Sequence, residues 1–236
     1  MCEDPAIGTV ATPDTLEPHR GAHVPPQAGS TLSLATLLVD AGSAAAVGDP
    51  QRDSLLFVHG GSGSLTLDGA AHPISRGSAA LVLRGETASL AAAEELAAVS
   101  VLAGTETDLH APMGEREIVV RLEDVEQGAA TGSRSFQVLF GPHNGSLLAT
   151  FFVGYIPPGA AKLHYHLYDE IVWILDGRAR LHADGETHEL PAGSAFRLTP
   201  RQQHIVENLD EARELTVLGV FTPAGSPSAA YRPATV

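Results

Sequence analysis

Residues 68–79 and 184–195 have similar sequences, DGAAHPISRGSA and DGETHELPAGSA, at an offset of 116 residues. A second match, LATLLV at 34–39 with LATFFV at 148–153, has an offset of 114, so we expect a two-residue insertion between the two matches. A repeat of this length is too long for a solenoid and is typical of a duplicated domain. The chain of 236 residues is therefore expected to contain two copies of one fold.

Within the second copy, short apolar or β-branched runs alternate with turn residues. EIVWIL is followed by Asp-Gly, RARLHA by DGE, HEL by PAG, and SAFRLT by PRQ. Such runs indicate strands in hairpins, and their close spacing favours a sandwich or barrel over a βαβ sheet. The window with the most helical character, TASLAAAEELAA at 87–98, falls where the duplication predicts a pair of strands. We therefore predict an all-β fold in which helix is a minor component.

Composition changes along the chain suggest four segments. Residues 1–29 are rich in Pro, Gly, Thr and acidic groups and are expected to form an irregular arm. Residues 30–103 form the first copy, and 136–236 form the second. Between them, residues 104–135 are expected to be a linker that adds one strand, within EREIVVRLEDV.

The charge of the chain limits the classes of partner. A formal net charge of −14 opposes attraction to nucleic acid and to anionic membranes, so a small molecule is the expected partner. No stretch approaches the roughly 20 apolar residues that span a membrane, and the N-terminus does not resemble a secretory signal. The one cysteine excludes an intrachain disulfide. These features lead us to expect a cytoplasmic protein.

The segment KLHYHLYDE contains a candidate metal site. Two histidines separated by one residue on a strand point to the same face, so His164 and His166 could hold one ion together. Glu170 follows closely enough to add an anionic oxygen. His204, in PRQQHIVEN, is the natural candidate for a fourth ligand, because the glycines and prolines before it fold the chain back.

The wider spacing of these residues resembles two motifs of the cupin superfamily. Residues 159–177 follow the pattern G-x4-H-x-H-x3-E-x6-G, and residues 185–208 follow G-x5-P-x-G-x10-H-x3-N. The resemblance extends over about residues 145–222, with one residue fewer than usual before the first histidine. It implies a small antiparallel β-barrel of jelly-roll type, and hence, with the duplication, two tandem barrels.

The resemblance also implies a metal centre. In cupins, residues equivalent to His164, His166, Glu170 and His204 bind the ion inside the barrel. One divalent transition metal is therefore expected. Three nitrogens and one oxygen suit Mn, Fe, Co, Ni, Cu and Zn alike.

The first copy has no equivalent ligands. At the offset of 116, Ser54 takes the place of Glu170 and Ala88 that of His204, while GDP at 48–50 or a neighbouring stretch faces the two paired histidines. His59 and His72 are expected to be surface or turn residues. The whole chain thus resembles a bicupin with a metal site in its C-terminal barrel.

Two functions are compatible with this pattern. The first is a metal-dependent enzyme of dioxygenase, isomerase or hydrolase type that acts on a small polar metabolite; the second is a protein that binds or stores a small molecule without turnover. The candidate proton-transfer groups are Lys162, Tyr155 and Tyr165, and the candidate pocket residues are Tyr168, Trp173, Arg180 and Phe196. Trp173 could instead be core and Arg180 surface, and the remaining strand edges would allow a homodimer.

Overall fold

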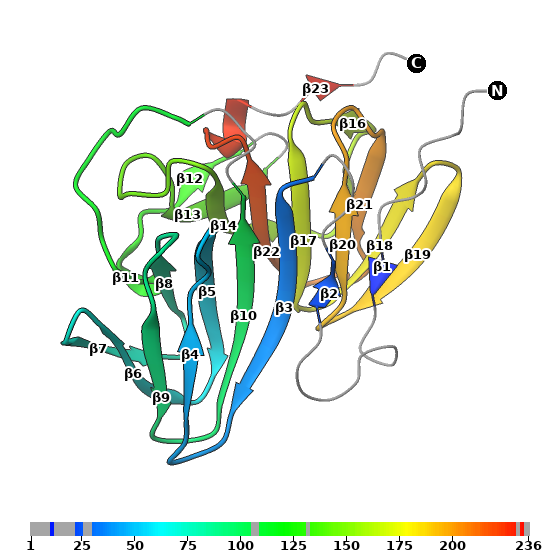
Figure 1. The fold of residues 1–236 in the computed structure, drawn as a ribbon. Helices are drawn as coiled ribbons and strands as arrows, with labels where there is room; N and C mark the ends of the chain where they lie inside the picture. Colours follow the sequence, from blue (N-terminus) through cyan, green and yellow to red (C-terminus); the bar gives the residue numbers. More distant parts are fainter. Residues whose placement is uncertain are drawn as a thin grey trace.

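A computed structural model gives the fold (Figure 1). It describes residues 10–11, 22–25, 30–104, 109–130, 133–229 and 232–233. Nearly all regular structure in these residues is antiparallel strand, which confirms the predicted all-β class. The helical elements of this part of the chain are two short 3-10 turns, Leu122–Asp124 and Pro227–Ala229, and none of its helices could cross a membrane.

The first half forms two antiparallel sheets. The strand order is β11-β8-β5-β10-β3-β2 in one sheet and β4-β9-β6-β7 in the other. The strands of the first sheet are β11 (Val119–Arg121), β8 (Ser78–Val82), β5 (Asp53–Gly60), β10 (Leu96–Ala103), β3 (Leu32–Val39) and β2 (Ala22–Val24). Those of the second are β4 (Ala44–Val47), β9 (Ala88–Ala92), β6 (Ser62–Leu67) and β7 (Ala70–Ser75).

The second half has the same plan. One sheet has the order β1-β20-β17-β22-β14-β13-β12, and the other has the order β19-β18-β21-β16-β23 with β15 also paired to β21. The first contains β1 (Val10–Ala11), β20 (Ala195–Leu198), β17 (Asp169–Asp176), β22 (Leu215–Thr222), β14 (Thr150–Ile156), β13 (Ser135–Phe140) and β12 (Gly128–Ala129). The second contains β19 (Glu186–Pro191), β18 (Arg178–Ala183), β21 (His204–Asn208), β16 (His164–Tyr165), β23 (Arg232–Pro233) and β15 (Gly159–Ala160).

Three apolar cores hold the sheets together. One core fills the space between the two sheets of the first half, and a second fills the space between those of the second half. A third core lies between the two halves, where the β5 sheet packs against the β17 sheet. Strand β3 of the first sheet and β17 of the second lie side by side in Figure 1. Each of these two large sheets is therefore buried on both faces.

Alternation along a strand assigns its side chains to one core or the other. In β17, Ile171 and Trp173 lie in the core between the halves, whereas Val172 and Ile174 lie inside the second barrel. Burial on both faces explains why EIVWIL reads as a continuous apolar run rather than as an alternating one.

Strand pairing gives the two halves the same register over much of their length. Leu65 is paired with His72, and Leu181 is paired with His188, which are the same positions shifted by 116 residues. The intervening turns also match, since Asp68 and Asp184 both have positive φ values, 50° and 52°. The predicted correspondence of 68–79 with 184–195 is thus seen in the strand pairing.

The match between LATLLV and LATFFV has a different register from the one predicted. Val101 in β10 and Val220 in β22 are equivalent, because each pairs with the corresponding residue of β5 or β17. Val101 pairs with Leu34 and Val220 pairs with Phe151, so the offset here is 151 − 34 = 117 and not 114. Strands buried on both faces have no alternation of polar and apolar residues that could fix an alignment. The identical letters in LATLLV and LATFFV therefore predict the wrong register for β3 and β14.

Other local predictions have mixed outcomes. The window at 87–98 contains β9 and the start of β10, so the alternative of a helix is wrong. EREIVVRLEDV does add a strand, because β11 pairs with β8. The arm is not wholly irregular, because β1 pairs with β20 in the second half and β2 pairs with β3 in the first.

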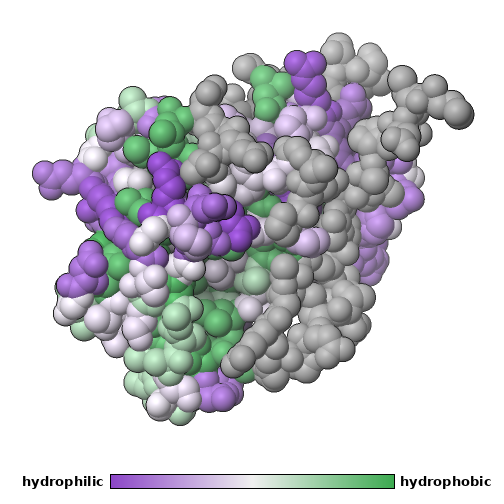
Figure 2. Space-filling model, in the orientation of Figure 1, coloured by the Kyte–Doolittle hydropathy of each residue, from purple (hydrophilic) through white to green (hydrophobic). Residues whose placement is uncertain are grey.

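Figure 2 shows apolar side chains at the lower left of this face, where the strands of the first half lie, and hydrophilic ones at the upper left. The exposed positions of β4 and β9 are alanine and serine rather than charged residues. These two strands therefore present a surface with little charge.

The core between the halves should make a large contribution to stability. Trp173 is only 4% exposed there, so Trp173→Ala should lower the free energy of unfolding by about 3–5 kcal/mol through lost burial and a residual cavity. Urea denaturation should be followed by circular dichroism. Tryptophan fluorescence is unsuitable, because the variant removes the sole tryptophan, Trp173.

The matched control is Met113→Ala, at a side chain that is 71% exposed, where we expect a change within about 0.5 kcal/mol. A similarly small change for Trp173→Ala would contradict the packing described here.

Candidate metal centre

Three histidines converge inside the second barrel. His164 begins β16 and is paired directly with His204, the first residue of β21. His166 follows β16 by one residue. One ring nitrogen of each lies within 4.8 Å of those of the other two, and no other such group of three or more His, Cys, Asp or Glu residues occurs in the described part of the chain. The structure therefore brings together three of the four predicted ligands.

Backbone carbonyls fix the orientation of two of these rings. The Nδ1 atom of His164 lies 2.8 Å from the carbonyl oxygen of Lys162, and Nδ1 of His204 lies 3.0 Å from that of Gln202. A carbonyl can only accept a hydrogen bond, so Nδ1 carries the proton in both neutral rings. Nε2 then carries the lone pair in each ring, as a metal ligand requires.

Burial keeps these two imidazoles neutral. It lowers the pKa of His164 to about 4, and the positive charges that His166 and Arg134 can carry act in the same direction. Burial also lowers the pKa of His204 well below its usual value, assisted by the other two histidines. Because only a neutral imidazole can bind a metal, both rings are prepared for that role near pH 7.

Glu170 lies beside His166 but outside the three-histidine group. Its Oε2 atom is 2.8 Å from Nδ1 of His166, yet both atoms are buried and neither makes a hydrogen bond. The contact is at ion-pair distance but lacks hydrogen-bond geometry, and buried polar atoms that make no hydrogen bond are uncommon because leaving them so costs free energy. A cation bound at this point would stabilise both, so the residues present fit the divalent ion that the sequence predicts.

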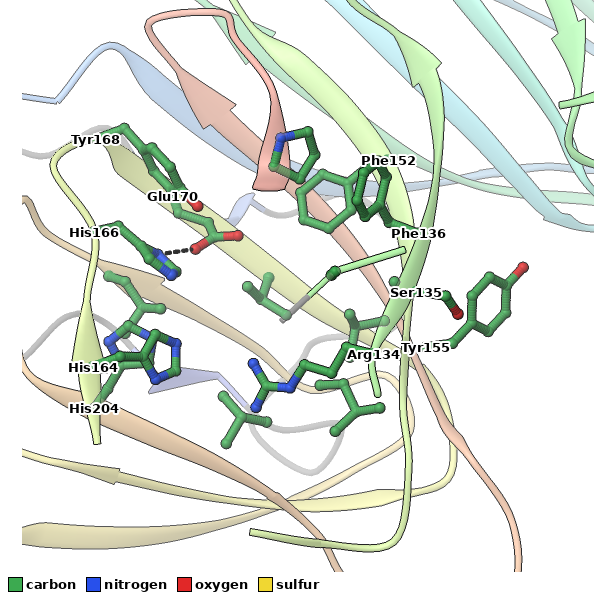
Figure 3. Close-up of a pocket in the computed structure, with 18 residues that line it drawn as sticks. Arg134, Ser135, Phe136, Phe152, Tyr155, His164, His166, Tyr168, Glu170 and His204 are labelled. Atoms are coloured by element: carbon green, nitrogen blue, oxygen red, sulfur yellow. Dashed lines mark ion pairs between the residues drawn. The ribbon is translucent and has the colours of Figure 1, made fainter. Parts of the chain in front are cut away.

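A compact cavity of about 120 Å³ opens beside the histidines (Figure 3). Its walls are mostly apolar. Phe152 is seated directly over Gly219, where an added Cβ would come within 2.3 Å of the phenylalanine ring. The ring of Tyr168 stacks on Phe221 with a centroid separation of 4.2 Å, and it also adjoins His166.

Two of the predicted tyrosines border this cavity in different ways. Tyr168 lines it, and burial together with the charge of Glu170 raises the pKa of its phenol, so the phenol stays protonated and can donate a hydrogen bond. Tyr155 also borders the cavity, but its phenol points away from the histidines (Figure 3) and donates to Oε1 of Gln137 at 2.5 Å. This geometry leaves Tyr155 without access to a ligand beside the histidines.

The other predicted proton-transfer groups do not line the cavity. Lys162 is exposed, and it contributes its backbone carbonyl to His164. Tyr165 lies between two histidines that point inward, so strand alternation places it on the opposite face.

Three predicted pocket residues also lie elsewhere. Trp173 packs between the two halves, with its ring 4.8 Å from that of His59 in an edge-on contact. Arg180 forms surface ion pairs with Glu189 and Glu207. Phe196 is in the core of the second barrel but does not reach the cavity wall. His59 is thus half-buried between the barrels, and burial lowers its pKa, rather than being a surface or turn residue as predicted.

The sequence predictions missed several cavity residues. Arg134, Phe136 and Phe152 all line it, and Arg134 lies in the segment expected to be linker. The sequence signal for Arg134 is its position directly before the apolar run SFQVLF. Only the fold, which pairs that run with β14, shows that Arg134 lies at the cavity.

The equivalent position in the first half is filled by apolar side chains. Val47 pairs with Ala88 as His164 pairs with His204, so Val47 takes the place of the first histidine and GDP at 48–50 is the turn that follows. Val47 and Ala88 both belong to the apolar core of that barrel. Ser54 is buried nearby at the position equivalent to Glu170.

The comparisons with known proteins agree with this architecture. Residues 151–221 match the family model of the cupin domain. No curated protein sequence matches the chain.

Several solved structures share its fold. AerE from Microcystis aeruginosa has 13% sequence identity and a TM-score of 0.71, with 92% of this chain and 98% of AerE covered. Oxalate decarboxylase from Bacillus subtilis has 14% identity and a TM-score of 0.71, with 98% and 80% covered. Salicylate 1,2-dioxygenase from Pseudaminobacter salicylatoxidans has 13% identity and a TM-score of 0.66, with 81% and 71% covered. The chain thus shares the two-barrel fold of these structures, and its residues 151–221 match the cupin domain model.

Proposed function

We propose that the second barrel binds one divalent transition metal through His164, His166 and His204, with Glu170 as the anionic ligand, and that the protein is an enzyme acting on a small molecule in the adjoining cavity. The observation that carries the proposal is the set of three imidazoles, two buried and one half-buried, whose ring nitrogens lie within 4.8 Å of one another. Two of them, His164 and His204, are held neutral with the proton on Nδ1, so that Nε2 carries the lone pair a metal ligand needs.

The structural relatives support this proposal at the level of chemistry. The oxalate decarboxylase of Bacillus subtilis has Mn(II) centres, and the salicylate enzyme is a dioxygenase. At 13–14% identity these proteins share the fold, and neither substrate is transferred to this chain. A cavity that adjoins the proposed centre is the feature that favours a reactive site over a closed structural one.

When bound, the metal would supply a Lewis acid to polarise an oxygen of the substrate. The protein residues have complementary roles. Phe136, Phe152 and Val217 exclude water from the cavity, and Tyr168 offers a neutral hydroxyl as a hydrogen-bond donor. Glu170 offers the carboxylate that balances part of the charge of the ion.

Metal content tests the proposal. Protein purified without a histidine tag and loaded with Mn(II), Co(II) or Zn(II) should hold about one ion per chain, as expected for a single three-histidine site, and His166→Ala should weaken affinity by more than about 100-fold. Elemental analysis after gel filtration gives the stoichiometry, and competition with a chromogenic chelator gives the affinity.

His182→Ala is the matched control, because His182 lies on the same barrel but contacts Glu207 at the surface. It should retain full stoichiometry. Wild-type protein that binds none of these ions, or His166→Ala protein that binds them normally, would exclude the proposed centre.

The contribution of Glu170 can be tested separately. Glu170→Gln keeps the size of the side chain but removes its charge, so metal affinity should fall at least about tenfold. Chelator competition provides the measurement, and Glu189→Gln, at an exposed position on β19, is the control. Equal affinities for the two variants would show that the carboxylate does not act on the ion.

Turnover decides between an enzyme and a binding protein. Metal-loaded wild-type protein and His166→Ala protein are incubated with small carboxylic acids in air, and the reaction is followed by oxygen uptake and mass spectrometry. Product that depends on His166 supports the enzyme. Binding of metal and ligand with no product after long incubation would leave the second function, storage or binding of a small molecule.

A further inference from the structure

Arg134 places a positive charge in the cavity from outside the predicted metal-binding segment. It lies just before β13, and its backbone carbonyl accepts a hydrogen bond of 2.8 Å from the amide of Ala130. Figure 3 shows its side chain extending into the cavity, with the guanidinium directed toward His164 and His204. Its charge contributes to the lowered pKa values of both histidines, as expected for a cation close to them.

The charges around the cavity favour an anion. Glu170 is the one carboxylate among the described residues that line the cavity, and Arg134 is the one permanent cation. For the ion and the described residues that line the cavity, the charges are +2 from a divalent ion, +1 from Arg134 and −1 from Glu170, which sum to +2. In a buried site of this kind, an anionic ligand is held much more tightly than a neutral one of the same shape.

The walls restrict what else the ligand can carry. The apolar residues of the wall include Phe136, Phe152, Val172, Leu198 and Val217. They leave uncharged ligand atoms with apolar neighbours. The cavity volume is small, about 120 Å³. The ligand body is therefore compact and apolar.

We infer that Arg134 is the specificity-determining residue of this cavity, and that it binds the carboxylate of a compact carboxylic acid whose hydrocarbon body lies against the phenylalanines. The planar fork of the guanidinium matches a carboxylate with two parallel hydrogen bonds. This inference rests on the proposed function only in that the bound metal would add to the positive charge of the cavity. The hydrogen bonds to the carboxylate are assigned to Arg134.

The test compares an acid with its neutral isostere. Isothermal titration of 3-methylbutanoate and 3-methylbutanamide, each into Zn(II)-loaded and metal-free protein, gives four dissociation constants. Wild-type protein should bind the acid at least about tenfold more tightly than the amide in both forms, because a charge-assisted bidentate pair is lost with the amide. Methyl phosphate is a third probe, and tighter binding of it than of the acid would overturn the assignment to a carboxylate.

Variants of Arg134 connect this preference to the residue. Arg134→Gln should lose the tenfold preference for the acid, and Arg134→Lys should recover part of it, because lysine keeps the charge but not the fork. Arg178→Gln, at an exposed position of β18, is the control and should behave as wild type. Circular dichroism and metal stoichiometry should be unchanged in all three variants, which excludes a general folding defect.

The outcomes separate the two proposals. Equal binding of acid and amide by wild-type protein, or an undiminished preference in Arg134→Gln, would overturn the role of Arg134 whether or not metal is bound. Failure to bind metal, with an acid preference that still depends on Arg134 in the metal-free protein, would instead exclude the metal centre and retain this inference.

Discussion

Packing of the two large sheets against one another is the constraint on which the rest of the structure depends. Because the β5 sheet and the β17 sheet cover each other, each strand has one face toward the other half and one face toward the interior of its own barrel. Because side chains alternate along a strand, every second residue faces the other half and the residues between them face the barrel interior. Glu170, Val172 and Ile174 face the interior of the second barrel, whereas Ile171 and Trp173 stabilise the contact between the halves.

This constraint accounts for what the sequence could and could not predict. The fold class, the repeat over 68–79 and 184–195, and the convergence of His164, His166 and His204 follow from turn residues and short-range spacing, which are local properties. The sequence leaves Trp173 open as a pocket or a core residue, because a strand buried on both faces shows no polar alternation; the structure places it in the core. Its odd separation from Glu170 was the overlooked signal. Arg134 could not be placed, because its position depends on long-range pairing of β13 with β14.

The two barrels differ most where a metal would bind. Val47 and Ala88 join the apolar core of the first barrel, whereas His164 and His204 at the corresponding positions remain polar, buried and without protons on their outer nitrogens. A buried polar cluster destabilises a barrel unless something satisfies it. The first barrel can therefore act as a structural partner of the second, where the cavity, the three histidines and Arg134 are concentrated.

The central claim, one ion in the second barrel and none in the first, is tested most directly by anomalous diffraction. Crystals of Co(II)-loaded protein would be measured on both sides of the cobalt absorption edge. The account predicts one anomalous difference peak per chain, bounded by the imidazoles of His164, His166 and His204, and none beside Val47 and Ala88. A peak located elsewhere, or no peak in crystals that contain cobalt by fluorescence, would contradict it.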